Sequence, residues 1–595
     1  MIFAGFLIFL GFLSAAPLFG AVCCGRRPER LFAAGLLFNA LLYYGFCAAH
    51  LCDAGFRLIF AANLGLYVPV LLKLRKKPEA FRDFLTPAVT VFYVTLTAGF
   101  LLALREFPLW WDEFSHWGSS AKFLFVYGKL NCEFPARLLG HASYPPGLAV
   151  LDTLVHKCFI GVGFRDFMPR FAIRAAKICL FLLPFGDAPR RLSYRECAAG
   201  MLIFWVVASL SLPDGNFSCE SDCILGVVFA AAVYVVMRHD RSVYDDLLLA
   251  LLLAWLFLIK KAGMGFAVMT QLLYIVRWVA DRTGGKTPKR PIWSFLVVLA
   301  APFLMQASWS LLLAVYDTPI KFPAGKISPD GIWELVRYGE PDHGREVAAR
   351  FGMKLVIRAP FFLLAMFAFV RYRKRADNRP RRDGDLLWFL PLAFAVYLAS
   401  LFLTYMFIFN IEQAKRLVSF RRYIHGFLLM PIGAVLMLML SDGREGKVRR
   451  FFASNAGLAL LLACEVGLYH WENFLVKPIA KRWVRDRVVL EARCGRILRA
   501  DGASFVAVSG AGDGLYHPIL KYEYGYSFVD ETPLCDLDDQ AELLEFVKQA
   551  RYVLIVMPPE NMAREFPDIW ETPPELKKDF TLFEVTPRGK LRPVR

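Results

Sequence analysis

One short stretch organises the rest of the chain: residues 109–117, with the sequence LWWDEFSHW. It places two adjacent carboxylates, Asp112 and Glu113, among three tryptophans, directly after the apolar run 85–104. A carboxylate is costly inside a lipid bilayer, and tryptophan prefers the boundary between membrane and water. The stretch therefore predicts a loop that presents acidic side chains at a membrane surface. A hydrated helix end with an aromatic anchor is the alternative interpretation.

The composition is that of a membrane protein. The 595 residues are 57% hydrophobic, and the mean hydropathy is +0.44. Apolar runs of about 16–25 residues recur from residue 1 to residue 474, which is the length that a membrane-spanning helix needs. The net charge is +18, from 70 basic and 52 acidic residues, and such an excess normally lies in cytoplasmic loops of membrane proteins. It is therefore not interpreted as a nucleic-acid-binding surface.

The alternation of basic and non-basic loops predicts the topology. The loops 25–30, 73–77 and 371–382 are strongly basic and are expected inside, which gives about 14 spans with both the N-terminus and the C-terminal region outside. Lys260 and Lys261 interrupt the apolar run 247–276. We interpret this run as a hairpin with the two lysines at its outer tip, because a single span would bury both charges.

Three regions follow from this pattern. Residues 1–84 are expected to form N-terminal transmembrane helices, and residues 85–474 a transmembrane core with outer loops 105–170, 213–222, 317–355 and 410–424. Residues 475–595 contain the strand-like runs 504–508 and 552–557 with a helical pattern between them, which predicts a small soluble α/β domain outside the membrane. The expected fold class is thus mainly α, a polytopic helix bundle with a small α/β domain.

Two helices are expected to lie on the membrane within the loop 105–170. Phe114, Trp117, Ala121 and Phe125 recur at helical spacing on one face, which is typical of an amphipathic surface helix. The apolar run 148–161 is too short to span easily and predicts a second surface helix, started by the turn 144–147 with the sequence YPPG.

Charged side chains gather on the predicted outer face. The acidic ones are Asp112, Glu113, Asp214, Glu220 and Asp222, and the cationic ones are Lys260, Lys261, Lys415, Arg416, Arg421 and Arg422. Side chains that reach lipid headgroups are the simpler explanation for these cations. A phosphate-binding site is the more specific explanation, because arginine and lysine pair well with phosphate oxygens. A carboxylate beside such a site could take a proton from an acceptor hydroxyl.

Arg421 and Arg422 cannot both face this site. Neighbouring residues on a helix point about 100° apart, so we expect one of the two to face a cavity and the other to face headgroups.

Taken in order, these features resemble the GT-C class of integral-membrane glycosyltransferases. The resemblance is to the polyprenyl-phosphate-sugar-dependent type, which includes protein O-mannosyltransferase and aminoarabinose-transferase relatives. It covers about residues 85–440 and rests on the acids at 112–113, the turn 144–147, Asp222, the lysine tip, and the stretch 419–423, SFRRY. In one respect the chain departs from the class. There, the acidic loop usually follows the first span, whereas here three further spans precede the span that leads into the loop.

The resemblance implies a site. It makes Asp112 the catalytic base, with Glu113 as a partner, and it makes a second set of residues candidates for binding substrate: Tyr144, Asp222, Lys260, Lys261, Arg421, Arg422 and Tyr423. His116 follows the acids and is a further candidate, although an interface histidine without a role is the simpler interpretation. No cofactor is expected; a divalent cation held between the two acidic loops is the less favoured alternative.

The expected function is transfer of a sugar from a polyprenyl-phosphate donor to a lipid or glycan acceptor, at the outer face of a bacterial inner membrane. A polymerase or ligase of lipid-linked glycans is the second hypothesis, because it uses the same lipid phosphates. A transporter ranks third, because the charges cluster at span ends and no internal repeat is found. The 13 cysteines form no CxxC pair; Cys219 and Cys223 are near enough in the chain to be considered as a disulfide.

Overall fold

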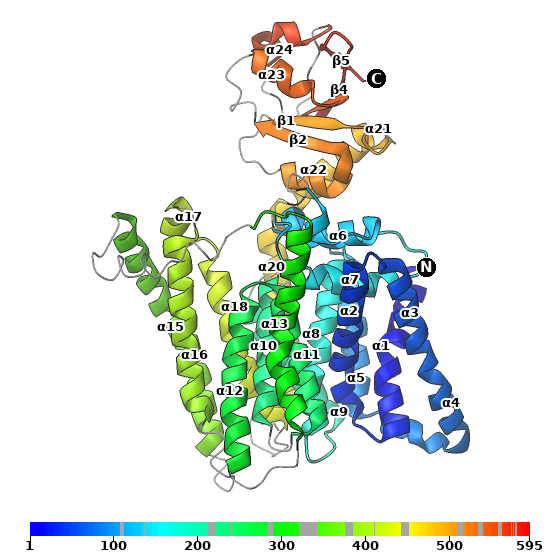
Figure 1. The fold of residues 1–595 in the computed structure, drawn as a ribbon, viewed down its shortest axis with the longest axis vertical. Helices are drawn as coiled ribbons and strands as arrows, with labels where there is room; N and C mark the ends of the chain where they lie inside the picture. Colours follow the sequence, from blue (N-terminus) through cyan, green and yellow to red (C-terminus); the bar gives the residue numbers. More distant parts are fainter. Residues whose placement is uncertain are drawn as a thin grey trace.

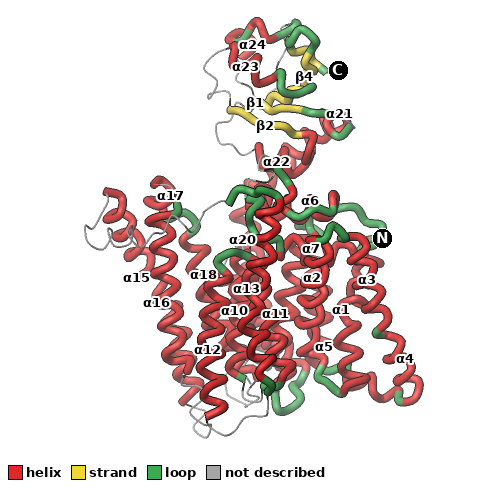
Figure 2. Tube along the Cα trace, in the orientation of Figure 1, coloured by secondary structure: helices red, strands yellow, loops and turns green. Residues whose placement is uncertain are grey.

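The molecule is a bundle of long helices with a small sheet beyond one end (Figures 1 and 2). The computed structural model describes residues 1–106, 112–135, 139, 141–211, 221–238, 241–283, 290–320, 342–374, 385–409, 411–441, 452–500, 503–509, 516–533, 540–556, 558, 562–572, 574, 576 and 580–594. We call the end of the bundle nearest the C-terminal sheet the sheet end. Met1 lies there too, with its sulfur near Gly161.

The bundle contains the following helices, given in chain order. The first half contains α1 (Ile2–Cys24), α2 (Leu31–Ala48), α3 (Cys52–Gly65), α4 (Tyr67–Lys76), α5 (Pro87–Ala103), the π-helical turn η3 (Glu113–Trp117), α6 (Gly118–Tyr127), α7 (Gly147–Lys157), α8 (Met168–Leu182), α9 (Tyr194–Ser211) and α10 (Ser221–Met237). The second half contains α11 (Val243–Ile259), α12 (Gly263–Thr283), α13 (Ile292–Val315), α15 (Asp342–Lys374), α16 (Asp385–Phe407), α17 (Ile411–Arg416), α18 (Phe420–Ser441) and α20 (Asn455–Leu490).

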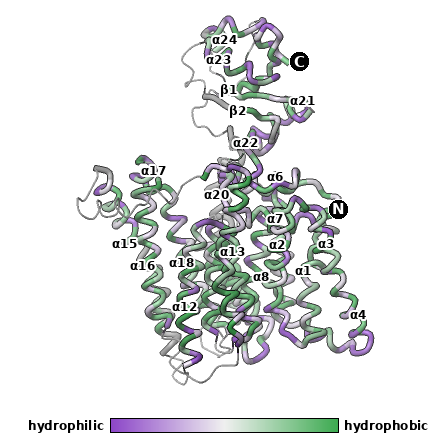
Figure 3. Tube along the Cα trace, viewed as in Figure 1, coloured by the Kyte–Doolittle hydropathy of each residue, from purple (hydrophilic) through white to green (hydrophobic). Residues whose placement is uncertain are grey.

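The lengths and composition of the described helices support the prediction of a membrane protein. Seven helical segments are long and apolar enough to cross a membrane: Ile2–Cys24, Pro28–Ala48, Cys52–Lys76, Gly263–Thr283, Ile292–Val315, Asp385–Phe407 and Phe420–Ser441. Three shorter apolar helices, Pro87–Ala103, Ser221–Met237 and Asn455–Cys464, accompany them. The other predicted spans coincide with α8, α9, α11 and α15. Hydrophobic residues run along the bundle, and hydrophilic ones gather toward its ends (Figure 3).

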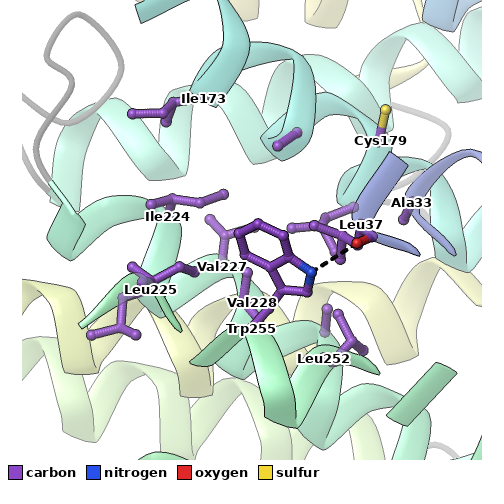
Figure 4. Close-up of a cluster of buried hydrophobic side chains, with 14 of the residues drawn as sticks. Ala33, Leu37, Ile173, Cys179, Ile224, Leu225, Val227, Val228, Leu252 and Trp255 are labelled. Carbon is purple, nitrogen blue, oxygen red and sulfur yellow. Dashed lines mark hydrogen bonds between the residues drawn. The ribbon is translucent and has the colours of Figure 1, made fainter. Parts of the chain in front are cut away.

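The bundle is held together by a continuous apolar core between α2, α8, α10 and α11. Figure 4 shows its centre, where the fully buried indole of Trp255 packs among branched side chains. The Trp255 Nε1–H donates to the carbonyl of Leu37 at 2.9 Å, so the polar atom of this large side chain is satisfied inside the core. This core fixes the helices that carry the candidate site.

The hairpin interpretation of the run 247–276 is confirmed. Helix α11 ends at Ile259, Lys260 is extended, and α12 begins at Gly263 and packs against α11. The two lysines therefore lie at the tip between two helices and not within one span.

The expected second surface helix is wrong in one respect. Helix α7 covers Gly147–Lys157 as the apolar run indicated, but residues 147–156 are all buried. It packs between α2, α6, α8 and α11 instead of lying exposed at the surface of the bundle. The physical reason is that most of the run is apolar, and that its polar side chains Asp152, Thr153 and His156 are also covered by neighbouring helices.

The C-terminal sheet has the strand order β2-β1-β3-β4-β5. It comprises β1 (Phe505–Ser509), β2 (Phe528–Pro533), β3 (Tyr552–Val556), β4 (Phe580–Val585) and β5 (Leu591–Pro593), with α22 (Tyr516–Tyr524), α23 (Gln540–Val547) and α24 (Met562–Glu565) around it. β1 pairs in parallel with β2 and β3, and β4 is antiparallel to its neighbours. Strand β1 is buried along its whole length, because the side chains on its two faces enter separate apolar clusters. The predicted boundary at residue 475 falls inside α20, which runs unbroken toward the sheet.

The sheet end of the bundle contacts α22 directly. The ring of Tyr522 meets Phe114 of η3 edge to face at 5.4 Å, and its hydroxyl donates to Asp166 at 2.5 Å. Arg487 bridges Asp166 and Glu523 at 2.8 and 2.6 Å. The C-terminal domain therefore packs against η3, the turn that follows Asp112.

Two reporter fusions test the predicted topology. Asp385, at the start of α16, pairs with Arg277 near the end of α12, so it lies at the end of the bundle opposite the lysine tip. We expect a fusion at Arg379 to be fluorescent with green fluorescent protein, which reports inside. A fusion at Asp513 should be active with alkaline phosphatase, which reports outside. Both fusion points lie outside the described residues, and activity of one reporter at both points would contradict the topology.

Candidate active site

A cavity of about 510 Å³ opens among the helix ends at the sheet end. Its lining comes from Asp112 and η3, the segment before α7, α10, the α11–α12 tip, α12, α16 and α18. Eight of the predicted site residues line it: Asp112, His116, Tyr144, Asp222, Lys260, Lys261, Arg422 and Tyr423. Residues from distant parts of the chain thus meet in one place. Glu113 and Arg421 are not among the lining residues.

Four charged side chains form an ion cluster in this cavity. The guanidinium of Arg422 pairs with the carboxylate of Asp112, and its Nε lies 2.9 Å from Oδ2 of Asp222. Lys260 donates from Nζ to the other carboxylate oxygen of Asp222 at 2.7 Å. The Lys260 ammonium also lies 4.9 Å from the centre of the Tyr423 ring, within the range of a cation–π contact. Cations and carboxylates alternate, so the cluster is held together by its own charges.

Two close backbone approaches bring these elements together. A side chain at Gly226 would lie 2.3 Å from the carbonyl oxygen of Gly426, so glycine lets α10 and α18 come close enough for Asp222 to reach Arg422. A side chain at Gly147 would lie 2.5 Å from the carbonyl oxygen of Leu258. That contact sets the start of α7 against the end of α11, and thereby Tyr144 beside the lysine tip.

The junction between α17 and α18 aims one arginine at the cavity. Leu417 and Ser419 both adopt left-handed backbone conformations, with φ of 49° and 60°. Such conformations cost about 1–3 kcal/mol each for residues other than glycine, and they persist where the surrounding structure holds them. Here the Tyr405 hydroxyl donates to the carbonyl of Val418 at 2.6 Å. Helix α18 then starts in a register that puts Arg422 on the cavity wall and leaves Arg421 exposed.

Burial and neighbouring charges set the proton affinities at the tip. Burial lowers the pKa of Lys260, but the Asp222 carboxylate and Tyr423 outweigh it, and the net pKa lies above the usual value. Burial lowers the pKa of Lys261, which has no carboxylate partner among the described residues and donates to Ser143 Oγ at 3.4 Å. Burial raises the pKa of Tyr144 to about 12, so its hydroxyl stays protonated at neutral pH.

Glu113 lies in a different environment from Asp112. Its side chain is fully buried, and its two carboxylate oxygens accept from Nε and Nη2 of Arg170 at 3.1 and 2.6 Å. The resemblance made Glu113 a partner of Asp112, but the structure places its carboxylate in a two-pronged pair with α8. The π-helical turn separates the two adjacent acids, so that one lines the cavity and the other anchors the turn.

This arrangement predicts that Glu113 acts on stability and not on chemistry. Removing one member of a buried ion pair typically costs about 3–5 kcal/mol, because the other charge stays buried without its partner. Glu113→Ala should therefore lower the midpoint of thermal unfolding in detergent markedly. The double variant Glu113→Ala with Arg170→Met should recover part of that loss. An unfolding midpoint equal to that of the parent would contradict this role.

Sequence reasoning missed part of the cavity wall. Trp117 and His141 both line the cavity, and the ring of His141 lies 4.3 Å from that of His116. The signal for His141 was its position three residues before Tyr144 in a predicted outer loop. The predicted positions 109–111, Asp214, Glu220 and Cys219 lie outside the described residues.

The cavity joins acid, cation and aromatic groups in one place, which suits proton transfer next to a bound anion. Among the described residues, no group of three His, Cys, Asp or Glu side chains is placed to hold a metal ion. No protein-family model matches the chain, and no curated protein matches it either. The chemistry that the cavity supports is therefore inferred from its own contacts.

Proposed function

We propose that this protein is a membrane glycosyltransferase that moves a sugar from a polyprenyl-phosphate donor to a lipid or glycan acceptor. We place the reaction at the extracytoplasmic face of a bacterial inner membrane, in keeping with the resemblance to the GT-C class. One observation carries the proposal: the ion cluster of Asp112, Asp222, Lys260 and Arg422 lies in a cavity that also has an apolar wall.

The apolar wall suits a lipid chain. Besides the charged side chains, the lining includes Phe266 of α12, Leu401 of α16, Ile408 directly after α16, and Phe427 of α18. A ligand that fills the whole cavity must therefore have both a charged part and an apolar part. A polyprenyl phosphate has this character, with its phosphate at the ion cluster and its chain along the helices.

The charge balance suits a phosphate diester. Three cations, Lys260, Lys261 and Arg422, line the cavity against two carboxylates, Asp112 and Asp222, which leaves an excess of one positive charge. A sugar linked to polyprenyl through one phosphate carries one negative charge. Binding such a donor would neutralise the cavity without burying a charge of either sign unpaired.

The proposed reaction uses the cluster in one step. Asp112 accepts the proton of the acceptor hydroxyl as the hydroxyl oxygen forms a bond to the anomeric carbon of the sugar. The bond from that carbon to the phosphate oxygen breaks, and polyprenyl phosphate leaves with its negative charge held by Arg422 and Lys260. In the structure Arg422 pairs with Asp112. A phosphate at Arg422 competes for the same guanidinium, so donor binding would release Asp112 to act as the base.

A binding experiment in nanodiscs tests the proposal. The purified protein should bind polyprenyl phosphate saturably, whereas polyprenol, which has the same chain without the phosphate, should bind far more weakly. Equal binding of the two lipids would contradict a phosphate site. Incubation with sugar-linked polyprenyl phosphate and envelope lipids should then release polyprenyl phosphate. Movement of the intact lipid between leaflets without loss of its sugar would instead favour a transporter.

A further inference from the structure

Four rings form one wall of the cavity: His116, Trp117, His141 and Tyr144. The His116 ring lies 4.3 Å from that of His141, at 31°, and 4.4 Å from that of Trp117. The Tyr144 ring lies 4.8 Å from His141 and 5.4 Å from His116, close to perpendicular to the latter at 82°. We call these four residues the ring wall. Its members come from the two sides of a predicted outer loop, η3 and the segment that precedes α7.

The ring wall adjoins the ion cluster. His116 follows Asp112 by four residues in the same helical turn, and Tyr144 interacts electrostatically with Lys260 and with Asp112. A group held against the wall would therefore lie beside both the proposed base and the proposed phosphate-binding cations. This is the position that the sugar of a polyprenyl-phosphate donor must occupy.

The wall has the chemistry of a surface for a neutral, hydroxyl-rich ring. Aromatic faces pack against the C–H groups on one side of a pyranose, while imidazole nitrogens and a phenol hydroxyl can bond its hydroxyls. None of the four ring-wall side chains carries a carboxylate or an ammonium group. Two imidazolium charges at 4.3 Å would repel one another, which disfavours a doubly charged wall.

We propose that the ring wall is the sugar-binding subsite of this cavity and that it takes a neutral pyranose, with His141 as a specificity-determining residue. The inference rests on the proposed function, since it assigns the sugar of the same donor. The inference goes beyond the proposed function because it separates recognition of the sugar, at the ring wall, from recognition of the phosphate, at Arg422 and Lys260.

The experiment compares two lipids that differ only in the sugar. Bare polyprenyl phosphate and mannosyl polyprenyl phosphate serve as the probes, and their affinities are measured for the parent and for His141→Ala in nanodiscs. We expect His141→Ala to weaken binding of the mannosyl lipid about tenfold, which is the upper range for one aromatic contact, and to leave the bare lipid unchanged. His141→Phe, which keeps a ring of similar size, should restore part of the loss and guards against misfolding of the alanine variant.

A second histidine provides the matched control. His156 is also buried and stacks on Phe125 at 4.1 Å, but it does not line the cavity. His156→Ala should leave the ratio of the two affinities at its parental value. If His141→Ala changes neither affinity, or both equally, the ring wall is not a sugar subsite; the proposed function then still stands, provided Arg422→Ala weakens the bare lipid. If the parent binds neither lipid, both proposals are overturned.

Discussion

Replacing Asp112 by asparagine is expected to lower sugar transfer about 10²–10⁴-fold, the usual range for loss of a general base. The variant keeps the size of the side chain and part of its hydrogen bonding to Arg422, so the protein should fold and insert like the parent. The phosphate contacts lie on Arg422 and Lys260, and the neutral side chain competes less for Arg422, so donor affinity should be retained or increased. The measurement is the rate of transfer from sugar-linked polyprenyl phosphate in nanodiscs, at saturating donor.

An exposed carboxylate at the same end of the bundle serves as the control. Asp53 pairs with Lys157 at 2.5 Å, its side chain is 79% exposed, and it lies outside the cavity lining. Asp53→Asn should transfer sugar at the parental rate. A fully active Asp112→Asn protein would remove Asp112 as the base, whatever the donor affinity.

The second large effect concerns two neighbouring arginines. Arg422 pairs with Asp112 and Asp222 in the cavity, whereas Arg421 is exposed outside it. Hydrogen bonds to charged groups are worth about 1.5–3 kcal/mol, so Arg422→Ala should weaken the binding of polyprenyl phosphate about 10- to 100-fold. Arg421→Ala is the matched control, with the same change of charge one residue away, and should be nearly neutral.

Lysine at position 422 gives a finer test of the same contact. It keeps the positive charge but loses the planar, two-pronged geometry by which Arg422 meets two carboxylates, so rescue should be partial. Donor-lipid affinity in nanodiscs is the measurement for all three variants. If both alanine variants bind the donor as well as the parent does, the phosphate site lies elsewhere and Arg422 only holds the cluster together.

Much of the architecture could be predicted because it depends on local pattern. Apolar runs located the helices of the bundle, and the two lysines within the run 247–276 located the α11–α12 turn. The β-branched runs 504–508 and 552–557 located two strands of the C-terminal sheet. The charges at span ends also selected five residues that line one cavity, Asp112, Asp222, Lys260, Lys261 and Arg422, and the resemblance added Tyr144 and Tyr423.

The contacts that decide the role of each acid could not be predicted. Glu113 pairs with Arg170, 57 residues further along the chain, and no local pattern joins the two. Likewise, the covering of α7 by four other helices depends on how the bundle assembles. Adjacent residues in sequence can thus have separate tasks, as Asp112 and Glu113 do here.

The orientation of the arginine pair illustrates the same limit. Helical geometry required that Arg421 and Arg422 point in different directions, but only the register of α18 decides which one enters the cavity. That register follows from the left-handed residues Leu417 and Ser419, which no rule for ordinary residues would place there. The contact between Tyr522 and Phe114 could not be predicted from the sequence either, because it joins segments that lie far apart in the chain.

The most direct test of the account is an electron cryomicroscopy structure of the protein in nanodiscs with polyprenyl phosphate. We predict that the phosphate lies within hydrogen-bond distance of Arg422 and Lys260, that the chain follows the apolar wall along α16 and α18, and that Asp112 no longer pairs with Arg422. A phosphate bound away from Arg422, with the Asp112–Arg422 pair intact and the lipid chain outside the cavity, would contradict the central claim.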